Sequence, residues 1–574
     1  MKQPKTASTT QDTSQVAPDP CMEQSYHVFM LPFIIKEGVD PKHLEERLSV
    51  YDTTKWIHVC DKVLSDEEEA RKAYNASKYF NKAAFEALHQ TTKPLHKSWR
   101  RQHKDNEFLE EFELKDRSYY RLDLNLSSRA RFAQFSAHLQ LQSVRVKLYS
   151  HNIGQIIYTT YYNEVLFQKD KERKTVENYS YLNAVEDINS CGRRVSLPFV
   201  PQPKQGSYAD QLTAVAAEIS ISINTESSHN TTSYKTDFDQ MAKSIVPAGS
   251  TAHTYQENAH HTIAKHAVGI IFNSTIKEDK YHETIIPAYD DRMILASIIS
   301  SDEAANLIPS YTEFKSLDEK TLSRISIYET EPDKAPYPND MTAYKDARQL
   351  YGIISCDSHN DYTVRDASML QKLMQKFSLD RWNEYKSYTG VSHHAFVMIK
   401  PPRDDNAFLF DNFSYLYVEM VSLVVVQRTA LLNILHNTSE ASRNIKSVHF
   451  PELRATSRVA KIRQDIAIFT ANINLLDITE QEQGDETYTK IRENLGVNTL
   501  SHNVKEQVEE LSDAAQAIRS SVYNAAALIV AVDALIIEID IDKLWPNETI
   551  KVSIILVILI VYLISRYIIT KKKY

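Results

Sequence analysis

The sequence predicts an α+β cytoplasmic domain, followed by long stalk helices and a C-terminal two-helix transmembrane hairpin. Three observations predict this fold class. Short apolar or alternating runs are confined to about the first 405 residues, long helical patterns follow, and an apolar run precedes three lysines near residue 574. We therefore expect four parts: a disordered leader (1–25), an α/β domain (26–405), a helical stalk (406–520) and a transmembrane hairpin (521–574).

The composition excludes several classes of protein. The net charge of −9 gives no overall attraction to nucleic acid, so no direct nucleic-acid partner is expected. The four cysteines have no paired spacing, which argues against a disulfide framework or a zinc site. The ten glycines are scattered singly, whereas phosphate loops and dinucleotide folds need clustered glycines. No catalytic motif is recognisable, so we expect neither an enzyme nor a tightly bound cofactor.

The α/β domain is predicted from short strand-like runs with helices between them. The first twenty residues are polar and contain no apolar core of signal-peptide length, so the domain is expected to stay in the cytoplasm. A segment rich in Ala, Glu and Lys, 65–88, is typical of helix. The runs expected to be strands are 27–35, 118–126, 143–150, 154–167, 268–272, 292–299 and 394–399.

The stalk is predicted from a 4-3-4-3-4 spacing of apolar residues. This spacing is typical of a coiled-coil seam, but an amphipathic helix packed within one subunit would show it equally well over so short a length. Both interpretations stay open. The spaced residues are Val504, Val508, Leu511, Ala515, Ile518 and Val522.

The hairpin is predicted from the end of the sequence. The run 552–564 has no charge, and its extension to Ile569 spans a bilayer if Arg566 reaches the headgroups. The lysines at 571–573 belong on the cytoplasmic side by the positive-inside rule, so an even number of crossings is needed. The second crossing would be 524–541.

Two acids within 524–541 carry a functional expectation. Asp533 and Asp540 are seven residues apart and share one helical face. In a ring of hairpins they would form two carboxylate rings, a feature of cation-selective pores. The alternative is an amphipathic helix on the membrane surface beside a single anchor, because each central acid costs about 2.5–3.5 kcal/mol on insertion.

From about residue 400 onward the layout resembles CorA-type divalent-cation channels. The loop between the two expected crossings reads Trp545-Pro546-Asn547 where magnesium-conducting members carry Gly-Met-Asn, so the resemblance puts Asn547 at the pore. A narrower resemblance is to the divergent CorA-like effectors of type III CRISPR antiphage defence. Three strings carry it: INSCGRRVSLPF (188–199), AYDDRMILASII (288–299) and ITEQEQGDETYTKI (478–491).

This resemblance implies a homo-oligomer, a pentamer, in the lipid bilayer of the bacterial inner membrane. It implies a multi-pass channel that a nucleotide second messenger opens, in some members S-adenosylmethionine joined to AMP (SAM-AMP), to permeabilise the membrane. The expected small ligands are therefore such a messenger and a divalent cation. Two alternatives remain: a constitutive magnesium transporter of the CorA family, which needs no nucleotide site, and a membrane-tethered scaffold or enzyme with one anchor.

The messenger site is expected at two of these strings. Arg193 and Arg194 follow Gly192 at an expected loop-to-strand junction, where guanidinium forks can hold phosphate or carboxylate. The set Asp290-Asp291-Arg292 opens an apolar strand, and its two acids can accept hydrogen bonds from ribose hydroxyls or an amino group, or face a cationic sulfonium. For both sets the alternative is an ordinary ion pair. Replacing both arginines is expected to weaken ligand binding and leave folding intact.

Overall fold

The computed structural model describes a large part of the chain and divides it into two compact units. Unit 1 is assigned Met1–Leu432 and Phe469–Leu500, and unit 2 is assigned Asn433–Ile468 and Ser501–Tyr574. The described residues are 21–36, 41–89, 109–115, 120–128, 131–149, 152–173, 178–193, 218–223, 263–276, 281, 283–288, 292–330, 337–360, 362–403, 408–446 and 452–538.

A mixed β-sheet forms the centre of unit 1. Its strand order along the main path is β10-β11-β12-β9-β1-β6-β5-β3-β2, with β4, β7 and β8 attached beside that path. Neighbouring strands are antiparallel except β12 and β9, which are parallel. The strands are β1 (Gln24–Ile35), β2 (Trp56–His58), β3 (Leu109–Leu114), β4 (Tyr120–Ser128), β5 (Arg131–Tyr149), β6 (Ile153–Asn163), β7 (Glu218–Ile223), β8 (Ile285–Pro287), β9 (Ile294–Ser300), β10 (Ser378–Leu379), β11 (Tyr388–Val391) and β12 (Ala395–Lys400).

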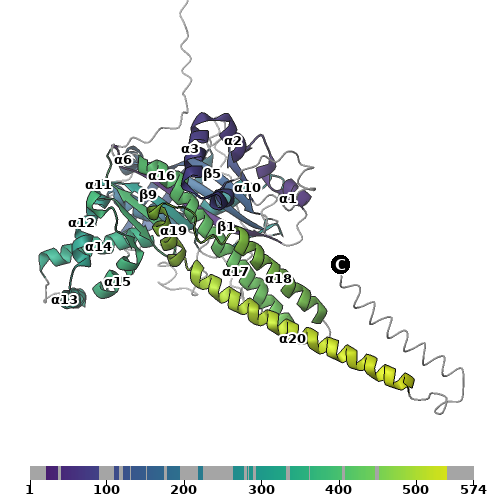
Figure 1. Ribbon diagram of the computed structural model, residues 1–574. Coiled ribbons are helices and arrows are strands. Elements are labelled where there is room, and N and C mark those ends of the chain that lie inside the picture. The colour runs from purple at the N-terminus through teal and green to yellow at the C-terminus, as the bar shows by residue number, and fades with distance from the viewer. Residues whose placement is uncertain are drawn as a thin grey trace, which may run out of the picture. The chain divides into compact units, whose positions relative to one another are not determined.

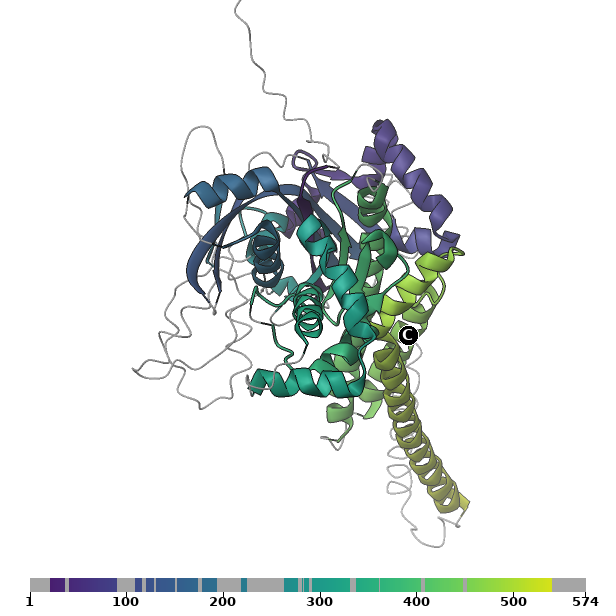
Figure 2. The ribbon, with the colours of Figure 1, turned by 90° about the vertical axis from the view of Figure 1, so that its left-hand side faces the viewer.

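One face of the sheet is covered by helices that supply the main apolar core. Alternate residues of β1, such as Phe29, Leu31 and Phe33, contribute to this core, because successive strand side chains point to opposite faces. Figure 2 shows strands coloured blue arching over these helices. The helices contributing to the core include α7 (Tyr181–Gly192), α10 (Ile263–Ile271), α12 (Leu307–Lys315), α13 (Glu319–Thr330), α14 (Pro338–Ser355) and α15 (Ala367–Phe377).

The opposite face of the sheet packs against a long helix. Helix α16 (Phe408–Asn412) passes through a π-helical turn, Phe413–Tyr417, into α17 (Val418–Lys446). The Tyr26 ring of β1 lies 5.5 Å from the Phe410 ring, centroid to centroid. Residues 420–426 of α17 are fully buried. Among the described residues one helix, Phe408–Arg443, is long and apolar enough to cross a membrane; 78% of its apolar window is buried, as in a core helix.

The remaining elements of unit 1 are α-helices and two 3-10 turns (Figure 1). Helix α3 begins at an N-cap, Asp66, whose side chain accepts from the amides of Glu68 and Glu69. The elements are α1 (Pro41–Arg47), a 3-10 turn at Ser49–Tyr51, α2 (Val59–Ser65), α3 (Glu67–Tyr79), α4 (Lys82–Leu88), α6 (Glu164–Arg173), α11 (Asp302–Ala305), a 3-10 turn at Asn383–Tyr385 and α19 (Glu482–Asn494).

Unit 2 contains the C-terminal part of α17, most of α18 (Glu452–Asn472) and the part of α20 (Val497–Glu538) after residue 500. Arg463 of α18 donates to the Ser512 hydroxyl of α20 over 3.1 Å. The seam residues Val504, Val508, Leu511 and Ala515 are at most 7% exposed within the single chain. For these four positions the structure therefore favours packing within one subunit. Ile518 and Val522 lie where side chains are outside the description.

Several expected elements are found, and some differ. Segments 27–35, 292–299 and 394–399 coincide with β1, β9 and β12, and 65–88 forms mainly α3 and α4. The prediction of a strand at 268–272 is wrong, because these residues end the buried helix α10. A short apolar run fits a buried helix as well as a strand. The expected domain boundary at 405/406 also differs from the division found, since residues up to Leu432 belong with the sheet.

Candidate functional site

Arg193 lies at the end of α7, against the core. The helix begins at Ser180, whose hydroxyl accepts from the amide of Asn183 over 3.3 Å, and every residue from 181 to 192 is buried. Arg193 itself is 0% exposed, and its carbonyl accepts a 2.6 Å hydrogen bond from the amide of Met293. The two expected ligand-binding strings are thus joined through their backbones, with Arg292 next to this bond.

The parallel strands β9 and β12 add two histidines at the same edge. Leu295 pairs with Ala395, and its amide donates to the carbonyl of His394 over 3.1 Å. Because the first residues of two parallel neighbours meet at one edge of a sheet, His393 and His394 lie beside the segment that contains Arg292. Arg292 and both histidines are solvent-exposed.

Helices α17 and α19 complete this edge. The Nδ1 of His393 donates to the carbonyl of Asn494 over 2.5 Å. Arg428 of α17 donates from Nη1 to the neighbouring carbonyl of Leu495 over 2.7 Å. The side-chain amide of Asn494 donates to the carbonyl of Val391 over 2.9 Å, which fixes the end of α19 against β11. We call Arg193, Arg292, His393, His394 and Arg428 the cation site.

The electrostatics of the cation site are those of convergent positive charges. The pKa of His394 is lowered to about 4 by partial desolvation of its ring, which is the largest cause, together with the charges of Arg193, His393, Arg292 and Arg428 in that order of importance. The charges of all three arginines therefore act on the imidazole of His394. In a chain with a net charge of −9 this is a local concentration of positive charge. The exposed guanidinium of Arg292 suits a phosphate or carboxylate group, whereas the fully buried Arg193 contributes its charge to the site.

A cysteine beside the cation site is not arranged as a nucleophile. Burial raises the pKa of Cys356 to about 11, although Arg193 and Arg292 act in the opposite direction. The thiol is therefore protonated at neutral pH, and the thiolate is the reactive form.

Most of the other predicted site residues are outside the described residues: Arg194, Asp290, Asp291, Asp540 and Asn547. Asp533 belongs to α20 (Val497–Glu538), the helix that also contains the seam positions 504–522. The predicted loop-to-strand junction at Arg193 is wrong, because this residue caps a buried helix. Arg292 stands two residues before β9, as expected from its apolar continuation.

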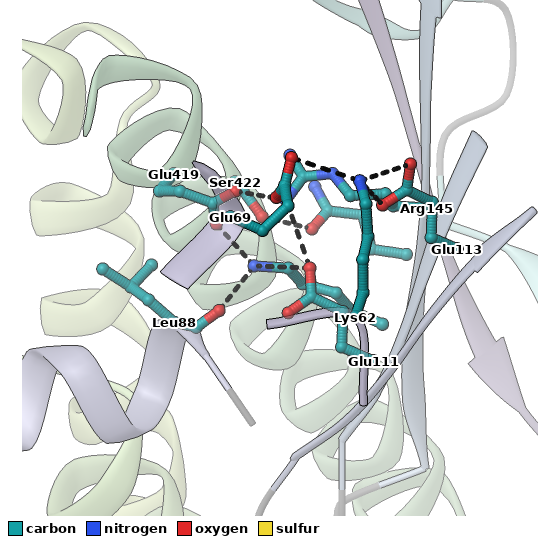
Figure 3. Close-up of polar contacts among 10 residues, drawn as sticks. Lys62, Glu69, Leu88, Glu111, Glu113, Arg145, Glu419 and Ser422 are labelled. Carbon is teal, nitrogen blue, oxygen red and sulfur yellow. Dashed lines mark hydrogen bonds and ion pairs between the residues drawn. The ribbon is translucent and has the colours of Figure 1, made fainter. Parts of the chain in front are cut away.

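A second polar cluster, which the sequence interpretation missed, lies between the sheet and α17 (Figure 3). The Glu419 carboxylate accepts from Arg145 Nη1 over 2.6 Å and from Lys147 Nζ over 2.5 Å. Lys147 also donates to the carbonyl of Leu88 over 2.6 Å, and Arg145 donates to Glu111 over 3.1 Å. Glu419, Lys147 and Glu111 are at most 1% exposed. We call Glu419, Arg145, Lys147 and Glu111 the buried ion cluster.

Strand register brings these charges together. Glu111 lies directly opposite Lys147, and Glu113 directly opposite Arg145, in the antiparallel pair of β3 and β5. Opposite charges at such cross-strand positions attract one another. Lys62 of α2 donates to Glu113 over 3.0 Å, so this row of charges continues from the sheet to α2.

The protonation of the cluster is set by burial and by its own charges. Burial alone would raise the pKa of Glu419, but Lys147 and Arg145 outweigh burial and hold that pKa below its usual range. Burial raises the pKa of Glu111, because the same cations compensate it less completely. The available sequence signal was the alternation in 144–148 and 110–114, together with a single acid in the apolar run 418–426.

A third feature is a cleft of about 720 Å³ beside β10 and α19. Residues 482–491 of helix α19 belong to the third string that carries the family resemblance, 478–491. Arg381 in this cleft is paired with Glu486 over 3.0 Å. Among the described residues, no group of three or more His, Cys, Asp or Glu side chains is placed to hold a metal ion. The lining residues are Ser378, Leu379, Asp380, Arg381, Asp485, Glu486, Thr489, Lys490 and Glu493.

Comparisons of the chain with protein-family models, with curated protein sequences and with solved structures gave no match.

Proposed function

We propose that this protein is a membrane-attached, ligand-gated effector whose cation site binds a nucleotide-like messenger through its phosphate and carboxylate groups. The supporting observation is the convergence of Arg193, Arg292 and Arg428, from distant parts of the chain, around one histidine. Two of these arginines belong to strings that carry the resemblance to CorA-like CRISPR effectors, a group for which the resemblance implies a nucleotide messenger. SAM-AMP, which carries a phosphate and an adenine nucleotide, is the ligand of this class that we propose.

The proposed output is a change in membrane permeability. Support for a membrane segment comes from the uncharged run 552–564 and the lysines at 571–573. In this proposal the C-terminal hairpins of a homo-oligomer, a pentamer by resemblance, form a pore lined by Asp533, Asp540 and Asn547 in the bacterial inner membrane. Ligand opens the pore only if it binds the open state more tightly than the closed state.

The experiment measures binding and permeability on the full-length protein reconstituted in lipid. Calorimetric titration uses SAM-AMP, with ATP and AMP as comparison ligands, and dye-loaded vesicles report permeability. Wild-type protein is expected to bind SAM-AMP and release dye. Arg292→Ala removes charge-assisted hydrogen bonds worth about 1.5–3 kcal/mol each, so affinity should fall roughly tenfold to a hundredfold.

The matched control is Arg381→Ala, an arginine of the same unit that pairs with Glu486 at the separate cleft. This variant should bind SAM-AMP as the wild type does. Equal affinities of Arg292→Ala and wild type would remove the cation site from the proposal. Dye release that is the same with and without every nucleotide tested would remove ligand gating.

A further inference from the structure

The buried ion cluster has an unusual position in the core. Glu419 is the only acid between 412 and 439 in a helix whose residues 420–426 are fully buried. Burying a carboxylate is unfavourable unless it is paired and hydrogen-bonded. Replacing such buried ion pairs by apolar residues is often neutral or stabilising, so their presence is poorly explained by stability alone. Their best-attested role is to specify one register among several apolar packings.

The contacts of Glu419 define one rotational setting of α17. The carboxylate accepts from both Arg145 and Lys147 of β5, and one turn later the Ser422 hydroxyl donates to Gln155 Oε1 of β6 over 2.7 Å. Rotating the helix by one residue, about 100°, would place an apolar side chain over the two cations. Neighbouring apolar residues impose no comparable preference, because most of them are valine or leucine.

The π-helical turn Phe413–Tyr417 directly precedes this contact. A π turn holds one more residue than an α turn, and such turns often occur at functional sites. If the extra residue moves or is lost, everything after it in the helix rotates by about 100°. The π-helical turn therefore gives this helix a place where its register could change, and the buried ion cluster that follows favours one register.

Arg428 lies on α17 nine residues after Glu419 and belongs to the cation site. A helix transmits rotation along its length, so the register at Glu419 also decides where Arg428 points. Gln427, beside it, is fully buried and donates from Nε2 to the carbonyl of Ile473 over 2.7 Å, which ties this part of α17 to the end of α18.

We infer that the buried ion cluster is a register latch: it holds α17 in the setting that completes the cation site with Arg428, and its release lowers affinity for the nucleotide-like messenger. The second half of this inference rests on the proposed function; the first half does not. Affinity falls because apparent affinity scales with the fraction of molecules in the binding-competent state.

The test compares two double variants of the full chain. Lys147→Met with Glu419→Leu removes the latch as a neutral pair and leaves Arg145 paired with Glu111. Arg47→Met with Glu283→Leu removes an ion pair elsewhere in unit 1, between α1 and the segment that precedes β8. Amide hydrogen exchange without ligand and calorimetry with SAM-AMP are measured on both, together with the thermal midpoint.

The latch variant is expected to keep a thermal midpoint close to that of the wild type. Exchange of the α17 amides 418–428 should accelerate at least fivefold relative to β1, and SAM-AMP affinity should fall at least fivefold. The control double variant should do neither. Glu419→Gln, which keeps the shape of the side chain, is expected to accelerate the same amides and provides the measurement if the leucine variant does not fold.

Identical α17 exchange in the latch variant and the control would overturn the latch. Accelerated α17 exchange with unchanged SAM-AMP affinity would overturn its link to the cation site. Failure of the wild type itself to bind SAM-AMP would count against the proposed function, while the exchange measurement would still decide whether the latch exists.

Discussion

The carbonyl of Arg193 accepts a 2.6 Å hydrogen bond from the amide of Met293, which joins the end of α7 to the start of β9. This bond connects two segments that the sequence marks separately as parts of one ligand site. The arginines of the two segments differ in burial: Arg193 is fully buried, whereas Arg292 is exposed.

This difference in burial predicts different effects on stability. Arg193→Ala should lower the free energy of unfolding by about 2–4 kcal/mol, since it removes a large buried side chain at a packed helix end. Arg292→Ala should change it by less than about 0.5 kcal/mol, as for most surface substitutions. Urea denaturation followed by circular dichroism measures both. Equal losses in the two variants would contradict this division. Because Arg193 is fully buried, we expect its replacement to affect folding, unlike the sequence-based expectation for the pair Arg193 and Arg194.

Gly192 should be intolerant of substitution. A Cβ at this position would lie 2.6 Å from Cζ of Phe29, closer than real Cβ atoms approach a neighbour, and 3.3 Å from Cδ1 of Ile263, a tight contact. Gly192→Ala should therefore cost about 1–3 kcal/mol through overpacking and shift the adjacent Arg193. Adding Phe29→Leu, which shortens the obstructing ring, should recover part of that loss in a double-mutant cycle. Additive losses would indicate that the helix end is not held against this ring.

The sequence predicted much of the fold where one periodicity dominates. Strands β1, β9 and β12 follow from their apolar runs, and the helices α3 and α4 follow from composition. The run 268–272 was assigned wrongly because five apolar residues carry no period that separates a buried helix from a buried strand. The part of α17 up to Leu432 was placed with the stalk, since nothing local reveals that the helix packs on the sheet.

The candidate site was predictable only in part. Arg193 and Arg292 were named because short local strings contain them, but His393, His394 and Arg428 join them through strand order and helix packing. The buried ion cluster was missed for the same reason. Pairing Glu111 with Lys147 requires the register of β3 on β5, which a single sequence does not specify.

Acid should destabilise unit 1 through a buried histidine. The His27 Nδ1 donates to Asn189 Oδ1 over 2.6 Å, and its Nε2 lies 2.9 Å from the Ser25 hydroxyl. Burial lowers the pKa of His27 to about 4, although the Asn189 bond acts in the opposite direction. The unfolded chain therefore takes up this proton near pH 6.5 and the folded chain only near pH 4, so stability falls as pH drops through that window.

The expected loss from this residue between pH 7 and pH 5 is about 2 kcal/mol. Denaturation with urea at several pH values measures it. His27→Gln removes the titrating group, so its stability should depend on pH less steeply than that of the wild type by this amount. Parallel pH profiles for the two proteins would show that His27 carries no part of the acid sensitivity.

The seam of α20 provides the last prediction. Val508 and Leu511 are 4% and 7% exposed within one chain, where the 4-3 spacing alone is compatible with packing between subunits. Val508→Ala combined with Leu511→Ala should therefore lower the free energy of unfolding of unit 2 by about 2–5 kcal/mol, the usual cost of such truncations in a core. Oligomer size, measured by light scattering after size-exclusion chromatography, should stay that of the wild type. The thermal midpoint should also depend on protein concentration no more than it does in the wild type, because loss of an intrachain contact is unimolecular.

Val508→Ile, which keeps the position apolar, is the matched control and should preserve both the stability of unit 2 and the oligomer size. Dissociation of the double alanine variant into smaller species would instead assign this seam to an interface between subunits.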